Sequence, residues 1–181
     1  MAKDSYILPI FDDTAVQPTL IIDSREQMPL QFTRLKSQPG SLQTGDYSIV
    51  GCEQLFGVER KSIPDLVQCC TGSNRERFCR ELHRLRGHQF KRLMIIGSKS
   101  EILTGRYRSG ISPQSIMASI SAWEIRFDTP VAWIPSPEEA SHQIESWACW
   151  FVREILKTAS TIVDKTKGDY ETEMQSAGTD R

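Results

Sequence analysis

The sequence lacks the features of a membrane-spanning, secreted or zinc-stabilised protein. Its longest uninterrupted apolar run, Trp147–Val152, has six residues, far short of the roughly 20 that a membrane-spanning helix needs. The five cysteines are an odd number without a Cys-x-x-Cys pair, which argues against a disulfide framework and a zinc ribbon. The first residues also lack the long apolar stretch of a signal peptide. We therefore expect an intracellular, cytoplasmic protein.

A large overall charge is also missing, because the formal net charge is −1. The distribution is uneven, however: residues 59–108 hold twelve Lys and Arg against five Asp and Glu, a local balance of +7. Such a block is either a solvated helix surface or a positive footprint for a polyanion such as nucleic acid. Charge alone leaves both interpretations open.

The length of 181 residues suits one domain with its own hydrophobic core. Residues 1–18 mix acidic residues with two prolines and show no sustained period, so we expect a flexible N-terminal extension. Residues 163–181 are polar after Val163 and carry no apolar stripe, which predicts a disordered C-terminal tail. The folded domain should therefore occupy residues 19–162.

Short β-rich runs predict five strands, and capping signals predict the helices that alternate with them. The strands are expected at residues 19–23, 43–50, 54–61, 93–96 and 131–134. Helices should begin after Ser62, Ser73, Ser112 and Ser136. Strands followed by alternating strands and helices indicate an α/β fold, in which helices flank a central mixed sheet.

Two carboxylates and an ammonium group should meet in this sheet. Side chains alternate along a strand, so Glu59 and Lys61 should project from one face and Arg60 from the other. A hairpin would bring Asp46 beside Glu59, and a paired carboxylate site suits a hard cation such as Mg²⁺. The alternative is a surface hairpin whose Glu and Lys form an exposed ion pair of little energetic value. Spacing alone favours the surface hairpin. The neighbouring Val58 and the apolar strands indicate that this strand is central, where charged residues need a reason, and this makes the two interpretations about equally supported.

The wider pattern resembles the signature of the XPF-type structure-specific endonucleases. It comprises Gly45-Asp46-Tyr47, then Val58-Glu59-Arg60-Lys61 with Asp65 four residues further on, and the upstream Asp23-Ser24-Arg25-Glu26. The resemblance runs from about Leu20 to Leu156 and is closest to the short, single-domain bacterial and phage forms. It implies a restriction-endonuclease-like PD-(D/E)xK fold. It also implies an Mg²⁺- or Mn²⁺-dependent enzyme that cuts duplex DNA near single-strand junctions, flaps and forks.

The resemblance also assigns roles to individual residues. Asp46 and Glu59 would be metal ligands, and Lys61 would assist the attacking water. Asp23 and Glu26 would complete the acidic cluster, with Asp23 also a candidate metal ligand. Arg60 and Asp65 would support the site or contact phosphate. The arginines expected along the DNA path are Arg25, Arg75, Arg77, Arg84, Arg106 and Arg108.

The last predicted helix, Pro137 to Leu156, suggests a partner for the domain. Trp150 falls off the apolar stripe of this helix, and an exposed tryptophan is a reasonable dimer contact. Members of the resembled family commonly pair through helices of the nuclease domain, so we expect a homodimer or heterodimer. A bacterial or phage protein of this kind would be associated with the nucleoid.

Two other functions are compatible with the same fold. One is a non-catalytic DNA-binding or scaffold subunit of a nuclease complex, which is disfavoured because Asp23, Asp46, Glu59 and Lys61 are all present. The other is a restriction or resolvase-type nuclease, which only substrate profiling would distinguish.

Overall fold

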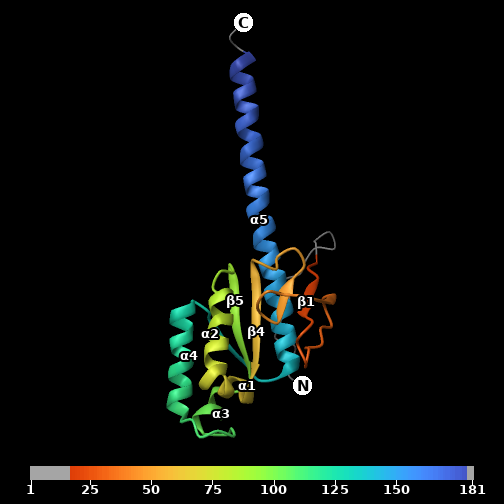
Figure 1. The fold of residues 1–181 in the computed structure, drawn as a ribbon. Coiled ribbons are helices and arrows are strands. Elements are labelled where there is room, and N and C mark those ends of the chain that lie inside the picture. The colour runs from red at the N-terminus through yellow and green to blue at the C-terminus, as the bar shows by residue number, and fades with distance from the viewer. Residues whose placement is uncertain (1–16, 179–181) are drawn as a thin grey trace.

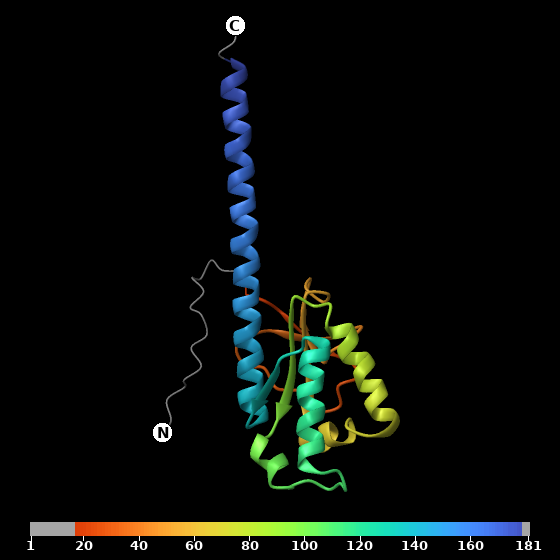
Figure 2. The same cartoon turned by 90° about the vertical axis from the view of Figure 1, so that its left-hand side faces the viewer.

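The strands and helices form one mixed sheet that is covered by helices on both faces (Figures 1 and 2). The structure is a computed structural model that describes residues 17–178, with side chains described over residues 17–166. The strands are β1 (Leu20–Asp23), β2 (Ser37–Gly40), β3 (Tyr47–Ile49), β4 (Phe56–Ser62), β5 (Phe90–Ile96) and β6 (Val131–Ile134). The helices are α1 (Ile63–Gln68), α2 (Gly72–Leu85), α3 (Lys99–Leu103), α4 (Pro113–Phe127) and α5 (Pro137–Gly178).

The six strands lie in the order β2-β1-β3-β4-β5-β6. Strand β3 pairs antiparallel with both β1 and β4, whereas the pairs β1–β2, β4–β5 and β5–β6 are parallel. The longest pairing joins β4 to β5 over seven residues, from Phe56↔Phe90 to Ser62↔Ile96. Strand β4 is therefore held on both sides in the middle of the sheet, as predicted for the strand that carries Glu59. The predicted α/β class with a mixed, helix-flanked sheet is confirmed.

Each face of the sheet has its own hydrophobic core. On one face, helices α1 to α4 pack against β5, with Phe78 and Trp123 in edge-to-face contact at 4.9 Å between ring centroids. On the other face, α5 packs over the sheet, and Phe151 contacts the ring of Phe56 at 5.4 Å. Figure 2 shows these two layers on opposite sides of the strands. Alternation along β5 serves both cores, because Leu93 and Ile95 belong to the first and Met94 to the second.

Serine caps begin most of the helices where the sequence predicted them. The side chains of Ser62 and Ser112 accept hydrogen bonds from the first-turn amides of α1 and α4, each of which has a proline in its first turn. The Ser136 hydroxyl accepts the amide of Glu139 at 3.1 Å, at the start of α5. The prediction for Ser73 is wrong: α2 begins at Gly72, and its N-cap, Thr71, makes no side-chain capping bond.

A buried carboxylate ties α5 to the N-terminal part of the chain. Glu145 is fully buried, and its Oε1 accepts the backbone amides of Thr33, Arg34 and Leu35 at 2.8–3.1 Å. These three residues lie in the loop between β1 and β2. Because an unpaired buried amide is costly, this single side chain fixes the loop against the last helix.

The helix α5 is longer than predicted. Its first part covers the sheet, and the remainder continues beyond the body of the domain (Figure 1). The tail predicted from residue 163 is therefore helical as far as Gly178; residues 179–181 lie outside the described residues, as do residues 1–16 of the predicted extension. The physical reason is that adding a turn to an existing helix costs little, and no proline interrupts residues 157–178.

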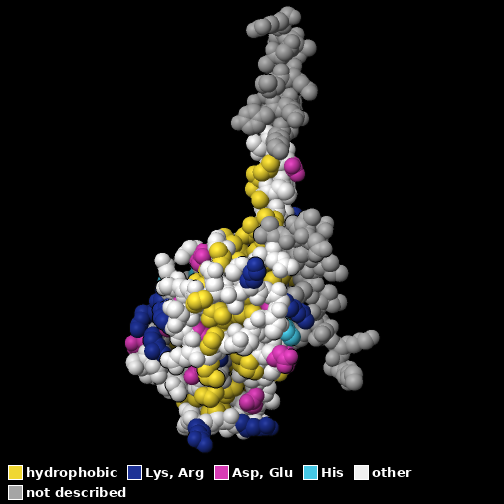
Figure 3. Space-filling model, turned by 90° about the vertical axis from the view of Figure 1, so that its right-hand side faces the viewer, with side chains coloured by type: hydrophobic (Ala, Val, Ile, Leu, Met, Phe, Trp, Pro, Cys, Tyr) yellow, Lys and Arg dark blue, Asp and Glu magenta, His cyan; other side chains and the backbone are white. Residues whose placement is uncertain are grey.

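Hydrophobic side chains remain exposed on this helix. Trp150, Leu156, Ile162 and Val163 have 45–60% of their surface exposed, and Figure 3 shows hydrophobic side chains along α5 and on the adjoining face of the domain. Within residues 17–178, no helix combines the length and hydropathy needed to cross a membrane.

Candidate active site

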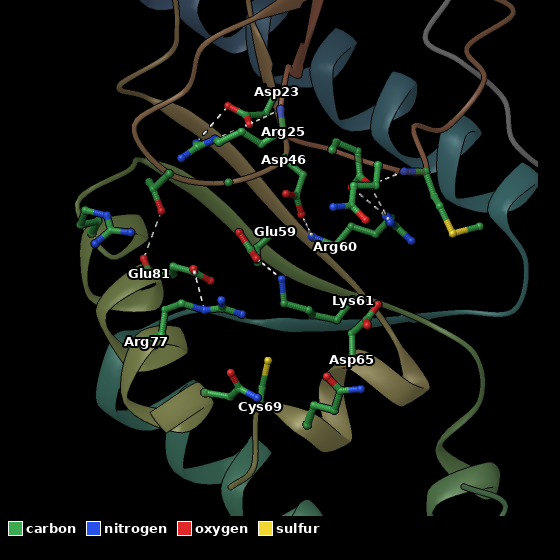
Figure 4. Close-up of a pocket in the computed structure, with 18 of the residues that line it drawn as sticks. Asp23, Arg25, Asp46, Glu59, Arg60, Lys61, Asp65, Cys69, Arg77 and Glu81 are labelled. Atoms are coloured by element: carbon green, nitrogen blue, oxygen red, sulfur yellow. Dashed lines mark hydrogen bonds and ion pairs between the residues drawn. The ribbon is translucent and has the colours of Figure 1, made fainter. Parts of the chain in front are cut away.

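A polar cavity of about 530 Å³ opens where the carboxyl end of β1, the turn before β3, strand β4 and helix α2 meet. Figure 4 shows its charged side chains pointing toward one another from these elements. The residues around it are acidic, basic and amide-bearing, with little apolar surface. The lining includes Asp23, Arg25, Glu26, Asp46, Glu59, Arg60, Lys61, Asp65, Gln68, Cys69, Asn74, Arg77, Glu81 and Arg84.

Strand β4 distributes its charged residues over two faces, as predicted. The ammonium of Lys61 donates to Oε1 of Glu59 on one face. On the other face, the Arg60 guanidinium makes a bidentate contact with Glu26, at 2.8 and 3.1 Å. Glu59 is 4% exposed, so the exposed ion pair considered as an alternative is excluded.

The turn before β3 places Asp46 against the same strand. Gly45 has φ of +81°, and a Cβ there would lie 3.3 Å from the carbonyl oxygen of Val58, so this turn requires glycine. The Asp46 amide then donates to the Val58 carbonyl at 2.8 Å. Its side-chain Oδ2 accepts the backbone amide of Arg60 at 2.7 Å. These bonds fix Asp46 over β4 beside Glu59, as the hairpin argument predicted (Figure 4).

Both carboxylates of the pair have a destabilised charged form. Burial, followed by the nearby charge of Glu59, raises the pKa of Asp46 to about 8. Burial also raises the pKa of Glu59, although the Lys61 ammonium opposes this shift. Burial alone would lower the pKa of Lys61, but the charges of Glu59 and Asp46 outweigh it and raise this pKa. Lys61 therefore stays protonated at neutral pH.

The other two predicted acids are held by arginines. Oδ1 of Asp23 accepts Arg25 Nε at 2.7 Å, and its Oδ2 accepts Arg25 and the amide of Leu42 at 3.1 and 2.8 Å. Burial would raise the pKa of Asp23, but these hydrogen bonds lower it. The bonds from Arg60 likewise lower the pKa of Glu26 against the effect of burial. Both acids are thus ionised and engaged, whereas Asp46 and Glu59 each keep one oxygen free of hydrogen bonds to the described residues.

The remaining wall is helix α2. Arg77 lies 3.9 Å from Glu81, one turn along the helix, and 67% of the Arg77 side chain is exposed. The hydroxyl of Thr44 donates to the Glu81 carbonyl at 3.2 Å, which connects the Asp46 turn to this helix. At the base, the Ser62 hydroxyl donates to Asp65 at 2.6 Å. The cavity thus has acids and cations on both its sheet side and its helix side, with Arg77 and Arg84 on α2.

Comparison with known proteins agrees with this geometry. The ERCC4 domain model matches residues 22–146, more than half of the chain. The chain belongs to the ERCC4 domain family. Its fold is also that of solved XPF chains from Aeropyrum pernix: one gives a TM-score of 0.57 at 21% identity, and another, in complex with DNA, gives 0.59 at 20% identity. A search of curated proteins gave no match.

These alignments cover most of this chain but less of its relatives. They include 72% and 76% of this chain, against 60% and 66% of the two XPF chains. This chain therefore spans under two thirds of their length. What is shared is the XPF-type nuclease domain with its restriction-endonuclease-like fold.

Three predicted DNA-path arginines of this ERCC4 domain lie outside the cavity. Arg75 packs between α2 and α4: its guanidinium lies over the Trp123 ring at 5.5 Å and donates to the Ser119 hydroxyl at 2.7 Å. Arg106 and Arg108 are exposed in the loop between α3 and α4. For Arg75 the reason is helical geometry, because among the arginines of α2 only Arg77 and Arg84 share the face that carries Glu81 toward the cavity.

Sequence reasoning did not place Glu81, Gln68 or Asn74 in the site of the ERCC4 domain. All three line the cavity from α1 and α2. The signal common to all three was their position on helices that follow the Glu59 strand, and spacing cannot show which side of a helix will face the sheet. Glu81 had the clearest local signal, since it lies four residues after Arg77.

Proposed function

We propose that this chain is a divalent-metal-dependent endonuclease that hydrolyses phosphodiester bonds in DNA. The observation that carries the proposal is the pair of half-buried Asp46 and buried Glu59 with Lys61 at the base of a cavity edged by arginines. Two carboxylates raise each other's pKa unless a cation neutralises them. Their cost to the fold suggests that the pair serves a ligand rather than stability.

The donor set fits Mg²⁺ or Mn²⁺. Asp46 and Glu59 would hold the ion through hard carboxylate oxygens, with water and phosphate oxygens supplying the rest, as is usual for Mg²⁺. Across the described residues, no group of three or more Asp, Glu, His or Cys side chains is arranged to hold a metal. Asp23 as a third ligand stays a prediction, because its oxygens accept Arg25 and Leu42. A bound divalent ion would polarise the phosphate and lower the pKa of a coordinated water.

The residues of the chain supply positioning and charge. Lys61 is an ammonium and not a base at neutral pH, so it would orient the attacking water and offset negative charge developing on the scissile phosphate. Glu59 holds that ammonium in place. The Glu26–Arg60 pair fixes the opposite face of β4, and through the Arg60 amide it holds Asp46.

DNA is the substrate that the cations around the cavity favour. Arg25 and Arg77 keep 69% and 67% of their side chains exposed at its rim, where guanidinium groups can contact phosphates. An XPF chain of the same fold has been solved with DNA. We further propose branched DNA, with flaps or forks at single-strand/duplex junctions, as arises in repair, recombination or replication.

A homodimer or heterodimer through the C-terminal helix is part of the proposal. Trp150 on α5 is 45% exposed, and the guanidinium of Arg153 lies over its ring at 5.0 Å. A second helix laid on this face would bury the ring. A twofold pair would also extend the surface available to DNA.

The deciding experiment is cleavage of labelled flap, fork, splayed-arm and linear duplex DNA in Mg²⁺, in Mn²⁺ and in EDTA. We expect cutting of the branched substrates with either metal and none in EDTA. Binding without cleavage in any metal would favour the non-catalytic subunit instead. Preferential cutting of linear duplex or of four-way junctions would favour a restriction or resolvase-type nuclease.

A further inference from the structure

A second hollow lies on the other side of helix α2 from the candidate active site. It measures about 410 Å³, within the range of small-molecule sites. It lies between α2 and the end of α4, and its surface is largely apolar. Its lining residues are Cys79, Arg80, His83, Arg84, Arg126 and Phe127. None of the six is acidic.

Two of the cations at this hollow have no ion-pair partner among the residues that the structure describes. Neither Arg80 nor Arg84 makes an ion pair or a side-chain hydrogen bond with any residue of the described chain. Both are exposed. Arg126 lies over the ring of Phe127 at 5.1 Å. Three guanidinium groups around an apolar floor form a site for a ligand that is anionic at its edges and flat and apolar at its centre.

Aromatic surface is available at the same point. The exposed ring of His83 meets the buried ring of Phe127 edge to face, at 6.4 Å between centroids. The faces of the His83 ring and of the Arg80 and Arg126 guanidinium groups are the surfaces on which a nucleobase can stack. Phosphates flanking the base would then lie among the guanidinium groups.

Arg84 connects this hollow to the active site, because it lines both cavities. Helix α2 therefore forms a ridge: Arg77 and Glu81 face the active-site cavity, and Arg80 and His83 face the second hollow. A nucleic-acid strand that leaves the cavity at Arg84 needs only to cross one helix to reach the hollow.

We propose that this hollow, defined by Arg80, His83, Arg84, Arg126 and Phe127, binds unpaired nucleotides of the single-stranded arm of the DNA substrate. This inference rests on the proposed function, which supplies the branched DNA substrate. It adds that the single-stranded arm of that DNA crosses α2. A duplex is too wide and too stiff to turn into this hollow, whereas a single strand can splay a base into it. The site would thus favour junctions over continuous duplex.

The test is binding of the full chain, in EDTA so that nothing is cut, to a fluorescein-labelled oligothymidine and to a blunt duplex of equal length. In Arg80→Ala/Arg126→Ala, the slope of log affinity against log salt for the single strand should fall by about 0.7 for each lost phosphate contact. His83→Ala should weaken single-strand binding roughly fivefold or more, the lower end of the loss of one stacked base. Affinity for blunt duplex should change less than twofold. Lys157→Ala, an exposed site on α5 across the sheet, is the matched control and should leave both affinities unchanged.

Three results would overturn the inference: unchanged single-strand affinity in the variants, equal losses on single strand and duplex, or wild-type protein that binds duplex but no single strand. Unchanged single-strand affinity in the variants would indicate that the hollow binds another anionic partner, such as an acidic peptide. Far-UV circular dichroism and thermal melting confirm that the variants are folded. Cleavage by the wild type in Mg²⁺ is scored separately. If the variants lose affinity for single strands selectively but the wild type cuts no DNA, the nuclease proposal alone is refuted. If the wild type cuts DNA but the variants show no selective loss of single-strand affinity, this inference alone is refuted.

Discussion

Replacing Asp46 by Asn should make the metal-free protein more stable, and increasingly so as the pH rises. The pKa of Asp46 is raised from 3.8 to about 8 by burial and by Glu59. Between these values the native protein binds a proton that the unfolded chain has released, so the free energy of unfolding falls with rising pH. The slope for one proton is about 1.4 kcal/mol per pH unit. The asparagine side chain of the variant has no proton to release, and its amide oxygen can still accept the Arg60 amide.

The magnitude can be measured by urea denaturation in EDTA at about pH 5 and about pH 7. Over that interval the wild type should lose roughly 2–3 kcal/mol of unfolding free energy that Asp46→Asn retains. The raised pKa of Glu59 acts in the same direction. Glu76→Gln, which removes an equal charge from an exposed position on α2, is the control and should follow the wild type.

Divalent metal supplies a second arm of the same experiment. Mg²⁺ at saturating concentration should restore stability to the wild type at neutral pH through binding to the native state. It should have little effect on Asp46→Asn. If the wild type and Asp46→Asn lose stability in parallel between the two pH values, then the carboxylates are not mutually destabilising and the argument for a cation site fails.

Four other substitutions test separate parts of the structure. Asp46→Ala should lower the cleavage rate by roughly a hundredfold or more with duplex binding retained; a wild-type rate would mean that the assigned site is wrong. Arg77→Ala should reduce the slope of log duplex affinity against log salt by about 0.9 per lost phosphate contact, whereas Arg106→Ala, outside the cavity, should not. Equal effects of the two variants would mean that the basic block is only a general charged surface. Trp150→Glu should dissociate the dimer while leaving the fold intact, and sedimentation of the wild type as a monomer at tens of micromolar would contradict this. Glu145→Ala should cost about 1–3 kcal/mol, because the buried amide of Leu35 loses its acceptor together with the less buried amides of Thr33 and Arg34. Glu145→Gln, which keeps an acceptor, should cost less, and urea denaturation separates the two.

The central part of the site could be predicted because its geometry is local. Alternation along β4 sets Glu59 and Lys61 on one face, and a single hairpin brings Asp46 to them. The serine and proline signals that begin α1 and α4 are also local. Each of these follows from a few consecutive residues and needs no knowledge of the rest of the fold.

Features that depend on distant contacts could not be predicted. Strand β2 is composed of Ser, Gln, Pro and Gly and is a strand only because β1 pairs with it; Pro39 is tolerated because β2 is the edge of the sheet. Arg75 resembles the other cations of α2 in sequence, and only the position of Trp123 on α4 shows that it packs inward. Asp23 likewise matches the acidic signature in the sequence. Only the fold of the following turn shows that its carboxylate accepts a hydrogen bond from Arg25.

The bond between Glu145 and residues 33–35 has a consequence for the timing of assembly during synthesis. The three amides are made 110 to 112 residues before the carboxylate that accepts them. At translation rates of about 5–20 residues per second, this interval lasts roughly 5–20 s. During it, residues 33–35 lack the acceptor that fixes them to α5, whereas Glu26 can already pair with Arg60 on the strand that carries Glu59. Residues 33–35 are therefore fixed against α5 only after the beginning of that helix has left the ribosome, so this part of the loop between β1 and β2 is completed late in synthesis.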